Sequence, residues 1–142
     1  MKRTATAVWS GGLKDGKGAL STQSNVLSNT PYSFSQRFED APGTNPEELV
    51  AAAHAGCFTM DLSGRLARAN MVAESINTTA TITLDKGEKG FSVTGSHLEV
   101  VAKIPNADAD ADAFQNAVNK AKEGCPISRL LNTTITVSAR LE

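Results

Sequence analysis

The residues of this chain best suited to chemistry are its two cysteines, Cys57 and Cys125. A thiolate attacks electrophiles, and two thiols that meet can cycle through a disulfide if their Cα atoms lie within about 7 Å. The sequence leaves Cys57 with a structural reading as well, because a cysteine on an apolar helix face is usually a small core residue. Cys125 lies between Gly124, which ends a helix, and Pro126, which suits the first position of the next. We therefore expect its sulfur at a helix N-terminus, which favours thiolate and makes Cys125 the more acidic thiol.

If the two sulfurs meet, their chemistry suits the reduction of a peroxide. Thiolate attack on the peroxide gives a sulfenic acid and an alcohol, and the second thiol condenses with the sulfenic acid to close a disulfide. Arg37 and Glu47 are the polar residues that such a site would use, because a guanidinium lowers a thiol pKa and a carboxylate holds the guanidinium in place. Each also has a structural reading, as a solvated strand arginine and a helix-start glutamate.

A metal site is the other chemistry that these residue types allow. His54 and Cys57 form a His-x-x-Cys step on one helix, and Cys125 and His97 would complete a four-ligand set. The paired Cys-x-x-Cys or His-x-x-x-His spacing that is usual for zinc is absent from the sequence. We therefore expect structural histidines, no metal and no cofactor. The glycine-rich segment GGLKDGKG precedes no helix start, so it does not predict a phosphate-binding loop.

Length and charge limit the class of protein. With 142 residues the chain fits one domain, 1–142, and its 14 Lys+Arg against 15 Asp+Glu give no electrostatic case for binding nucleic acid or an anionic membrane surface. The start, MKRTATAVWSGG, lacks the apolar segment of a signal peptide, and no run of about 18 apolar residues occurs. These features predict a cytoplasmic protein, where cysteines stay reduced unless they are functional.

The first half of the chain predicts three strands and a long helix. Residues 3–9 and 18–22 are predicted to form antiparallel strands around a glycine-rich turn. Residues 32–38 (YSFSQRF) alternate aromatic with polar residues and predict a strand in which Arg37 points away from the core. Asn45 and Pro46 then mark a helix start, and the helix is expected to reach about residue 69. Its apolar positions recur at helical spacing (Leu49, Ala53, Cys57 and Met60), and the stripe is mostly of small residues (Ala52, Ala53 and Gly56) that let another backbone approach. Glu47 lies ten residues before Cys57, a rise of about 15 Å, so it cannot contact the cysteine of its own helix.

The second half predicts a hairpin, two helices and a last strand. Residues 76–84 and 91–104 alternate around a turn-rich connection, and Pro105 and Asn106 end the second strand. A helix over residues 109–123 has an apolar face formed by Phe114, Ala117, Val118 and Ala121. After Cys125 come a short helical turn and a strand over 133–141. The predicted order is βββ-α-ββ-αα-β, an α+β fold.

Three long segments carry a resemblance to a known family. PYSFSQRFED contains Arg37, GTNPEELVAAAHAGCF contains Glu47 and Cys57, and KAKEGCPISRLL contains Cys125. In these segments and over nearly its whole length the chain resembles the OsmC/Ohr family of organic hydroperoxide reductases. The resemblance implies an intertwined homodimer with antiparallel sheets around long central helices and active sites at the subunit interface. It also implies that Cys57 is peroxidatic and Cys125 resolving, the reverse of the helix-terminus argument, and that Arg37 and Glu47 come from the opposite subunit.

The function that this resemblance implies is a thiol peroxidase that reduces organic hydroperoxides, and hydrogen peroxide more weakly. Turnover then needs an external dithiol, of lipoyl type in the family, to reopen the Cys57–Cys125 disulfide. Phe34, Phe38 and Met60 are candidates to bind an alkyl tail. Two rival hypotheses stay open at this point. One is a non-catalytic thiol redox sensor or binding module, and the other is a structural dimer whose cysteines are merely buried.

Overall fold

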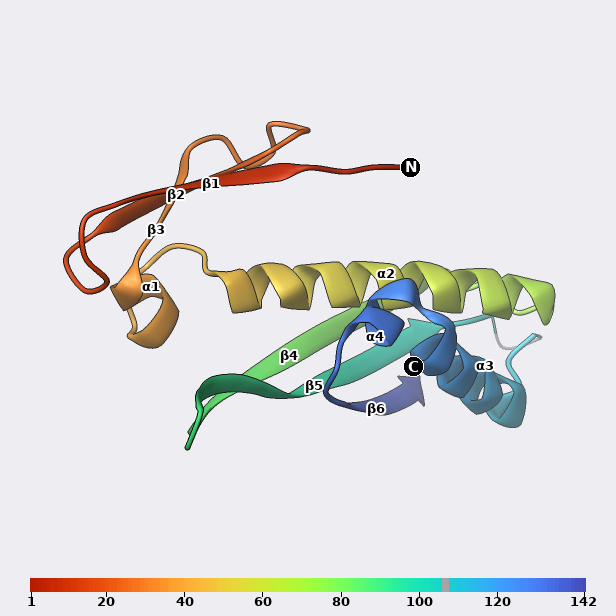
Figure 1. Cartoon of the computed structure of the whole chain (residues 1–142). Coiled ribbons are helices and arrows are strands. Elements are labelled where there is room, and N and C mark those ends of the chain that lie inside the picture. The colour runs from red at the N-terminus through yellow and green to blue at the C-terminus, as the bar shows by residue number, and fades with distance from the viewer. Residues whose placement is uncertain (106–107) are drawn as a thin grey trace. The chain divides into compact units, whose positions relative to one another are not determined.

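The computed structural model describes residues 1–105 and 108–142, so Asn106, at the expected end of the second long strand, lies outside the described residues. The elements are β1 (Ala5–Ser10), β2 (Lys17–Thr22), β3 (Thr30–Tyr32), α1 (Phe34–Phe38), α2 (Pro46–Arg68), β4 (Ser75–Gly87), β5 (Gly90–Lys103), α3 (Ala111–Gly124), α4 (Pro126–Leu130) and β6 (Thr134–Leu141) (Figure 1). They form two compact units, Met1–Leu49 and Val50–Glu142.

The first unit is a small antiparallel sheet, in the strand order β1-β2-β3, followed by α1. The rings of Trp9 on β1 and Tyr32 on β3 lie 5.5 Å apart across β2. Gly18 lies beneath them, and a Cβ there would clash with a Tyr32 ring carbon. A side chain at this position would therefore separate the two rings. The buried hydrophobic residues among those described all lie between Phe58 and Cys125, so this unit contributes none of them.

Residues 34–38 form the short helix α1, and the strand predicted over 32–38 is wrong. Only Tyr32 of that segment belongs to a strand. The aromatic residues Phe34 and Phe38 alternate with polar residues, but they are also four positions apart, which places their rings on one side of a helical turn at 5.0 Å. The spacing of the aromatic residues is compatible with both a strand and a helix. The orientation expected for Arg37 from a strand does not hold.

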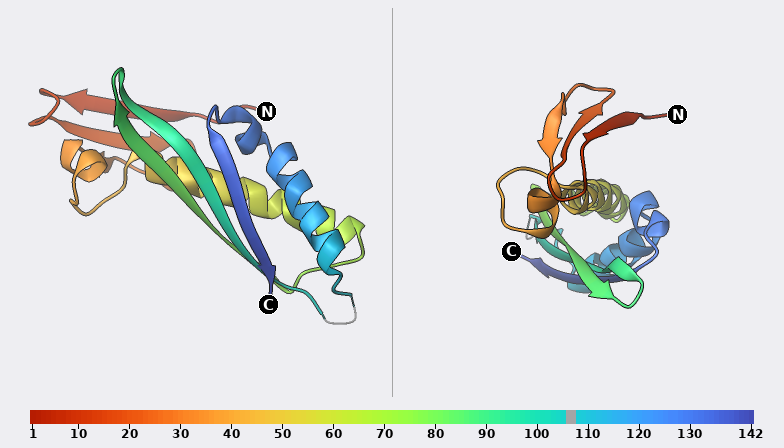
Figure 2. Two further views of the ribbon diagram at one scale, coloured as in Figure 1. Left: turned by 90° about the horizontal axis from the view of Figure 1, so that it is seen from below. Right: turned by 60° about the vertical axis from the view of Figure 1, so that its left-hand side comes forward.

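The second unit is built on a three-stranded sheet in the order β4-β5-β6. The predicted β4–β5 hairpin is confirmed, with a register that pairs Ala80 with Leu98. The expectation of purely antiparallel sheets is wrong, because β6 runs parallel to β5. The two helices α3 and α4 lie between β5 and β6 in the chain, as a parallel connection requires, and α3 runs along β6 (Figure 2).

The hydrophobic core of the second unit lies between this sheet and the helices α2 and α3. The buried side chains come from α2 (Phe58, Leu62, Leu66), from β5 (Leu98, Val100, Ala102) and from α3 (Phe114, Ala117, Val118, Ala121). The predicted apolar face of α3 is thereby confirmed. The stripe predicted for α2 does not pack on this sheet, since Met60 is 79% exposed and Ala53 is also exposed. Both sides of α2 carry apolar residues, and the side with the larger ones packs on the sheet.

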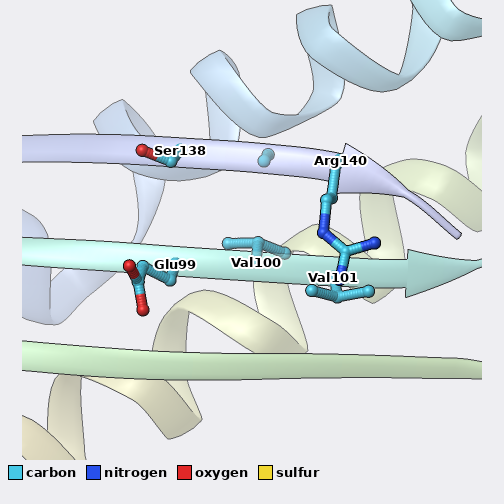
Figure 3. A pocket seen from close by; sticks show the side chains of 6 residues that line it. Glu99, Val100, Val101, Ser138 and Arg140 are labelled. Carbon is cyan, nitrogen blue, oxygen red and sulfur yellow. The ribbon is translucent and has the colours of Figure 1, made fainter.

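The other face of the sheet is polar. Alternation along β5 turns Glu99 and Val101 away from the helices, and Ser138 and Arg140 of β6 lie beside them over a shallow hollow of about 350 Å³ (Figure 3). The two faces of β5 thus differ, and its buried residues are the ones that face the helices. Among the described residues, no helix is long and apolar enough to cross a membrane.

Candidate active site

The structure brings Cys57 and Cys125 together. Cys57 lies on α2 and Cys125 between α3 and α4, and their Sγ atoms are 2.8 Å apart with both cysteines as free thiols. Cys125 is fully buried and Cys57 is partly exposed. The requirement that the sequence could not test, that the two sulfurs meet, is therefore met. A reagent that approaches from solvent reaches Cys57 first.

Cys125 is placed by a sharp break between two helices. It is the C-cap residue of α3, and its N–H donates to the Ala121 carbonyl at 3.0 Å. It is also the N-cap residue of α4, and its carbonyl accepts from Arg129 N–H at 3.0 Å. Pro126 at the first position of α4 has no N–H to leave unsatisfied. The predicted Gly-Cys-Pro break is confirmed, and it holds the Cys125 sulfur toward α2.

The sequence predicts that the start of α4 favours thiolate at Cys125. The Cys125 side chain makes no capping hydrogen bond to α4. The N–H of Ile127, in the first turn of α4, instead donates to the sulfur of Cys57 and lowers its pKa. The sequence identified the helix terminus, but only the approach of α2 and α4 decides which sulfur it faces. This contact agrees with Cys57 as the nucleophile.

Other contacts act on Cys57 in the opposite direction. Burial raises the pKa of the Cys57 thiol above its usual range, and the hydrogen bond with Cys125, the charge of Cys125 and the charge of Asp61 act in the same direction. Asp61 lies one turn after Cys57 and accepts from Arg65 Nε at 2.6 Å. Within the described chain the balance therefore favours the neutral thiol.

The Asp61–Arg65 ion pair was not predicted from the sequence. Its signal is the spacing of Cys57, Asp61 and Arg65 at four-residue intervals, which places them on one side of a helix. Arg65 also reaches the end of α3, because a Cβ added at Gly124 would clash with its Nη2 atom. Gly124 thus leaves room for a guanidinium directly before Cys125.

His54 is fully buried and lies one turn before Cys57. Its Nδ1 is 2.6 Å from Ser96 Oγ and its Nε2 is 2.7 Å from Ser128 Oγ, so both ring nitrogens have hydrogen-bond partners. Burial lowers the pKa of His54. His97 follows Ser96 on β5 and therefore lies on the opposite face of the sheet, so the structure does not bring the two histidines together. The described residues contain no cluster of metal-binding side chains.

Arg37 and Glu47 form an ion pair in the first unit. Arg37 Nη2 is 2.8 Å from Glu47 Oε1, and Nε lies 3.2 and 3.3 Å from the two carboxylate oxygens, which is a bidentate arrangement. The pair depends on the start of α2, where Asn45 Oδ1 accepts from Glu48 N–H at 2.8 Å as the predicted N-cap. Arg37 also lies over the Phe38 ring, with its Cζ 5.1 Å from the centroid.

Fold and site together define a small α+β protein with two free thiols in contact. The chain belongs to the OsmC-like protein family, whose model matches residues 38–140. It is 46% identical over 136 residues to peroxiredoxin OsmC of Escherichia coli, covering 96% of this chain and 94% of that protein. It is 30% identical over 126 residues to the organic hydroperoxide resistance protein OhrB of Bacillus subtilis, covering 88% and 89%.

Solved structures agree with this assignment. The crystal structure of Bacillus subtilis OhrB is 26% identical to this chain, with a TM-score of 0.67 over 98% of both chains. An OsmC-like protein of unknown function from Vibrio cholerae has a TM-score of 0.79 over 99% of both chains at 18% identity, which shows the fold alone. The predicted family and the coarse α+β fold are thus confirmed.

The charge of Asp61 gives a first test of the site. Asp61→Asn removes a negative charge one turn from Cys57, so we expect the Cys57 pKa to fall and its alkylation by iodoacetamide at neutral pH to accelerate. Peptide mass spectrometry measures the rate at Cys57. Asp112→Asn, at the exposed start of α3, is the control and should leave the rate unchanged. An equal rate in Asp61→Asn and wild type would contradict this account of the site.

The burial of His54 predicts a pH dependence of stability. Because the folded pKa is lowered from its usual 6.5, the unfolded chain binds this proton first as the pH falls. The contribution of His54 is thus complete above about pH 6.5 and is lost as the pH falls through the folded pKa. Urea unfolding between about pH 7 and pH 5 should show the decline, and His54→Gln should flatten it. His97→Gln is the control and should leave the decline unchanged. An unchanged decline in His54→Gln as well would show that other groups cause it.

Proposed function

We propose that this protein is a cysteine-based peroxidase that reduces organic hydroperoxides, and hydrogen peroxide more weakly. The observation that carries the proposal is the contact of a partly exposed thiol, Cys57, with a buried second thiol, Cys125, at 2.8 Å. It is supported by the names of the two relatives, a peroxiredoxin and an organic hydroperoxide resistance protein. Cys57 is the peroxidatic residue because solvent and the Ile127 N–H both reach it.

The proposed reaction has two steps in the protein. The Cys57 thiolate attacks the terminal oxygen of the hydroperoxide, so that an S–O bond forms, the O–O bond breaks and the alkoxide leaves as the alcohol after taking a proton. The Cys125 sulfur then attacks the sulfenic sulfur, so that an S–S bond forms and the S–O bond breaks, and the leaving hydroxide takes the thiol proton as water. An external dithiol, of lipoyl type by family resemblance, reduces the disulfide. Such a reductant fits a cytoplasmic protein.

Activation of Cys57 requires a cation, because no cation among the described residues shifts its pKa and Arg65 is paired with Asp61. The Arg37–Glu47 pair is the proposed source. A held guanidinium lowers the thiol pKa and donates to the peroxide oxygens. Helix α2 is continuous from Pro46 to Arg68, and ten residues rise about 15 Å along it. The pair of one subunit is therefore proposed to serve the cysteines of its partner.

Two further observations support a homodimer. The first unit has a three-stranded sheet but no buried hydrophobic side chain among its residues, and a sheet of this size needs a covering surface to be stable. The outward side of α2 carries small residues and Met60, which is 79% exposed. A second copy of the chain would bury both surfaces and complete the site.

The alkyl tail of the substrate has a candidate pocket next to Arg37. A hollow of about 310 Å³ in the first unit is lined by Trp9, Leu13, Tyr32, Ser33, Phe34, Arg37 and Phe38. Its aromatic walls suit an apolar tail, and Arg37 at its edge would hold the peroxide group. The sequence proposal for Phe34 and Phe38 stands, and Met60 is not among the lining residues.

Peroxidase activity is tested by turnover. Wild-type protein should consume cumene hydroperoxide over many cycles with dihydrolipoamide, and Cys57→Ser should lose this activity. In Cys125→Ser, one equivalent of peroxide should leave a sulfenic acid on Cys57, which mass spectrometry detects as a dimedone adduct. Consumption that stops after one equivalent in the wild type would favour the redox sensor. Faster oxidation of Cys125 in Cys57→Ser than of Cys57 in Cys125→Ser would reverse the assignment of the two sulfurs.

Subunit complementation tests where Arg37 acts. Arg37→Met and Cys57→Ser homodimers should each lose activity, by a factor on the order of 10² or more for the arginine. A heterodimer of the two variants keeps one intact site if Arg37 acts across the interface, and it should show about half of the wild-type activity per dimer. Refolding the two variants together, with separate tags to purify the mixed species, provides the sample. An inactive heterodimer would place Arg37 at the cysteines of its own subunit.

A further inference from the structure

His54 is a buried group that the proposed chemistry does not use. Its ring nitrogens contact Ser96 Oγ at 2.6 Å and Ser128 Oγ at 2.7 Å, and both serines are themselves buried. A neutral imidazole donates from one nitrogen and accepts at the other, so the ring can satisfy both hydroxyl groups at once. These two bonds link three elements, α2, β5 and α4, one helical turn from Cys57.

The element that gains most from this link is α4. It has only five residues, which is too short to be a stable helix without tertiary contacts. Two consecutive residues of its first turn contact α2, since Ile127 N–H donates to the Cys57 sulfur and Ser128 bonds to His54. Cys125 directly precedes this turn. Whatever holds the first turn of α4 on α2 therefore also holds Cys125 at Cys57.

The two contacts differ in one respect. The Ile127 bond ends on the reacting sulfur, and it weakens when the Cys57 thiolate becomes a neutral sulfenic acid, because bonds to charged acceptors are the stronger ones. The Ser128–His54 bond involves no reacting atom and is unchanged by oxidation. It is thus the contact that remains while Cys125 has yet to attack.

We infer that the His54–Ser128 hydrogen bond is a positioning device for disulfide closure, which keeps Cys125 within reach of the Cys57 sulfur after that sulfur is oxidised. For the peroxide-driven step this inference rests on the proposed function. The hydrogen bonds of His54 and Ser128 involve neither the substrate nor the reacting sulfurs. His54 and Ser128 act by holding α4 in place, and Ser96 fixes the orientation of the His54 ring.

The chain allows the two bonds of His54 to be removed one at a time. An asparagine amide at position 54 extends about as far as Nδ1 and keeps a partner for Ser96, whereas a glutamine amide extends about as far as Nε2 and keeps one for Ser128. Positioning through Ser128 predicts that His54→Gln retains closure and that His54→Asn loses it. A general loss of core packing would affect both variants alike. Ser128→Ala removes the same bond with the smallest change in volume.

The first measurement uses no peroxide. The equilibrium between the Cys57–Cys125 disulfide and the dithiol is measured in dithiothreitol redox buffers by quantifying free thiols. In Ser128→Ala and His54→Asn we expect it to shift toward the dithiol by about tenfold, or about 30 mV for this two-electron couple. His54→Gln should remain close to wild type. His97→Gln is the matched control, because His97 also bonds to two hydroxyl groups, those of Thr136 and Ser138, on the opposite face of β5.

The second measurement follows one equivalent of cumene hydroperoxide by rapid quench. Ser128→Ala should lower the rate of disulfide closure relative to the rate of peroxide consumption by about tenfold. More Cys57 should then be trapped by dimedone.

Circular dichroism and urea unfolding identify any variant that fails to fold, and in that case Ser128→Ala decides the question. Ser128→Ala equal to wild type in both measurements, or equal losses in His54→Asn and His54→Gln, would overturn the inference. A wild-type chain that closes its disulfide in redox buffer but ignores peroxide would instead overturn the proposed function.

Discussion

The contact between the Cys57 and Cys125 sulfurs depends on the packing of α2 on the sheet of the second unit. Burial of Phe58 and Leu62 fixes the rotation of α2 about its axis, and Cys57, one residue before Phe58, comes to the border between the buried and the exposed side. The same core holds α3, whose last turn ends in Cys125. Each sulfur is thus positioned by apolar burial that has no chemical role of its own, and the polar contacts adjust a geometry that the core already sets.

Within this geometry the reactivity of Cys57 is a balance of opposing effects. Burial, Cys125 and Asp61 raise its pKa, and the Ile127 N–H lowers it. Arg65 lies two turns after Cys57 on α2 and is engaged by Asp61 at 2.6 Å. A resting thiol that is activated only when a further cation arrives would be protected from indiscriminate oxidation. The bidentate Arg37–Glu47 pair is suited to that part because its guanidinium is already oriented.

The two units of the chain differ in what stabilises them. The second has a continuous core and the cysteine pair, whereas the first has an ion pair, an aromatic pocket and no buried hydrophobic side chain among its residues. The region that matches the OsmC-like family begins at residue 38 and includes Glu47 and both cysteines. The proposed homodimer would bring the ion pair of one subunit to the cysteines of its partner.

Local signals in the sequence determined much of this protein. The Asn45 cap, the apolar face of α3, the β4–β5 hairpin and the break at Cys125 depend on neighbouring residues, whose spacing is visible in the sequence. The three segments around the four predicted site residues also identified the family correctly.

Contacts between distant segments decided the rest. The segment 34–38 fitted two periodicities, and the parallel pairing of β6 follows from where α3 and α4 pack. Which side of α2 is buried depended on side-chain size opposite β5. The helix terminus at Cys125 was visible in the sequence, but only the approach of α2 directs its N–H to Cys57. A sequence specifies which groups can donate, accept or ionise, and the tertiary structure alone determines which of them meet, because those distances depend on packing between residues far apart in the chain.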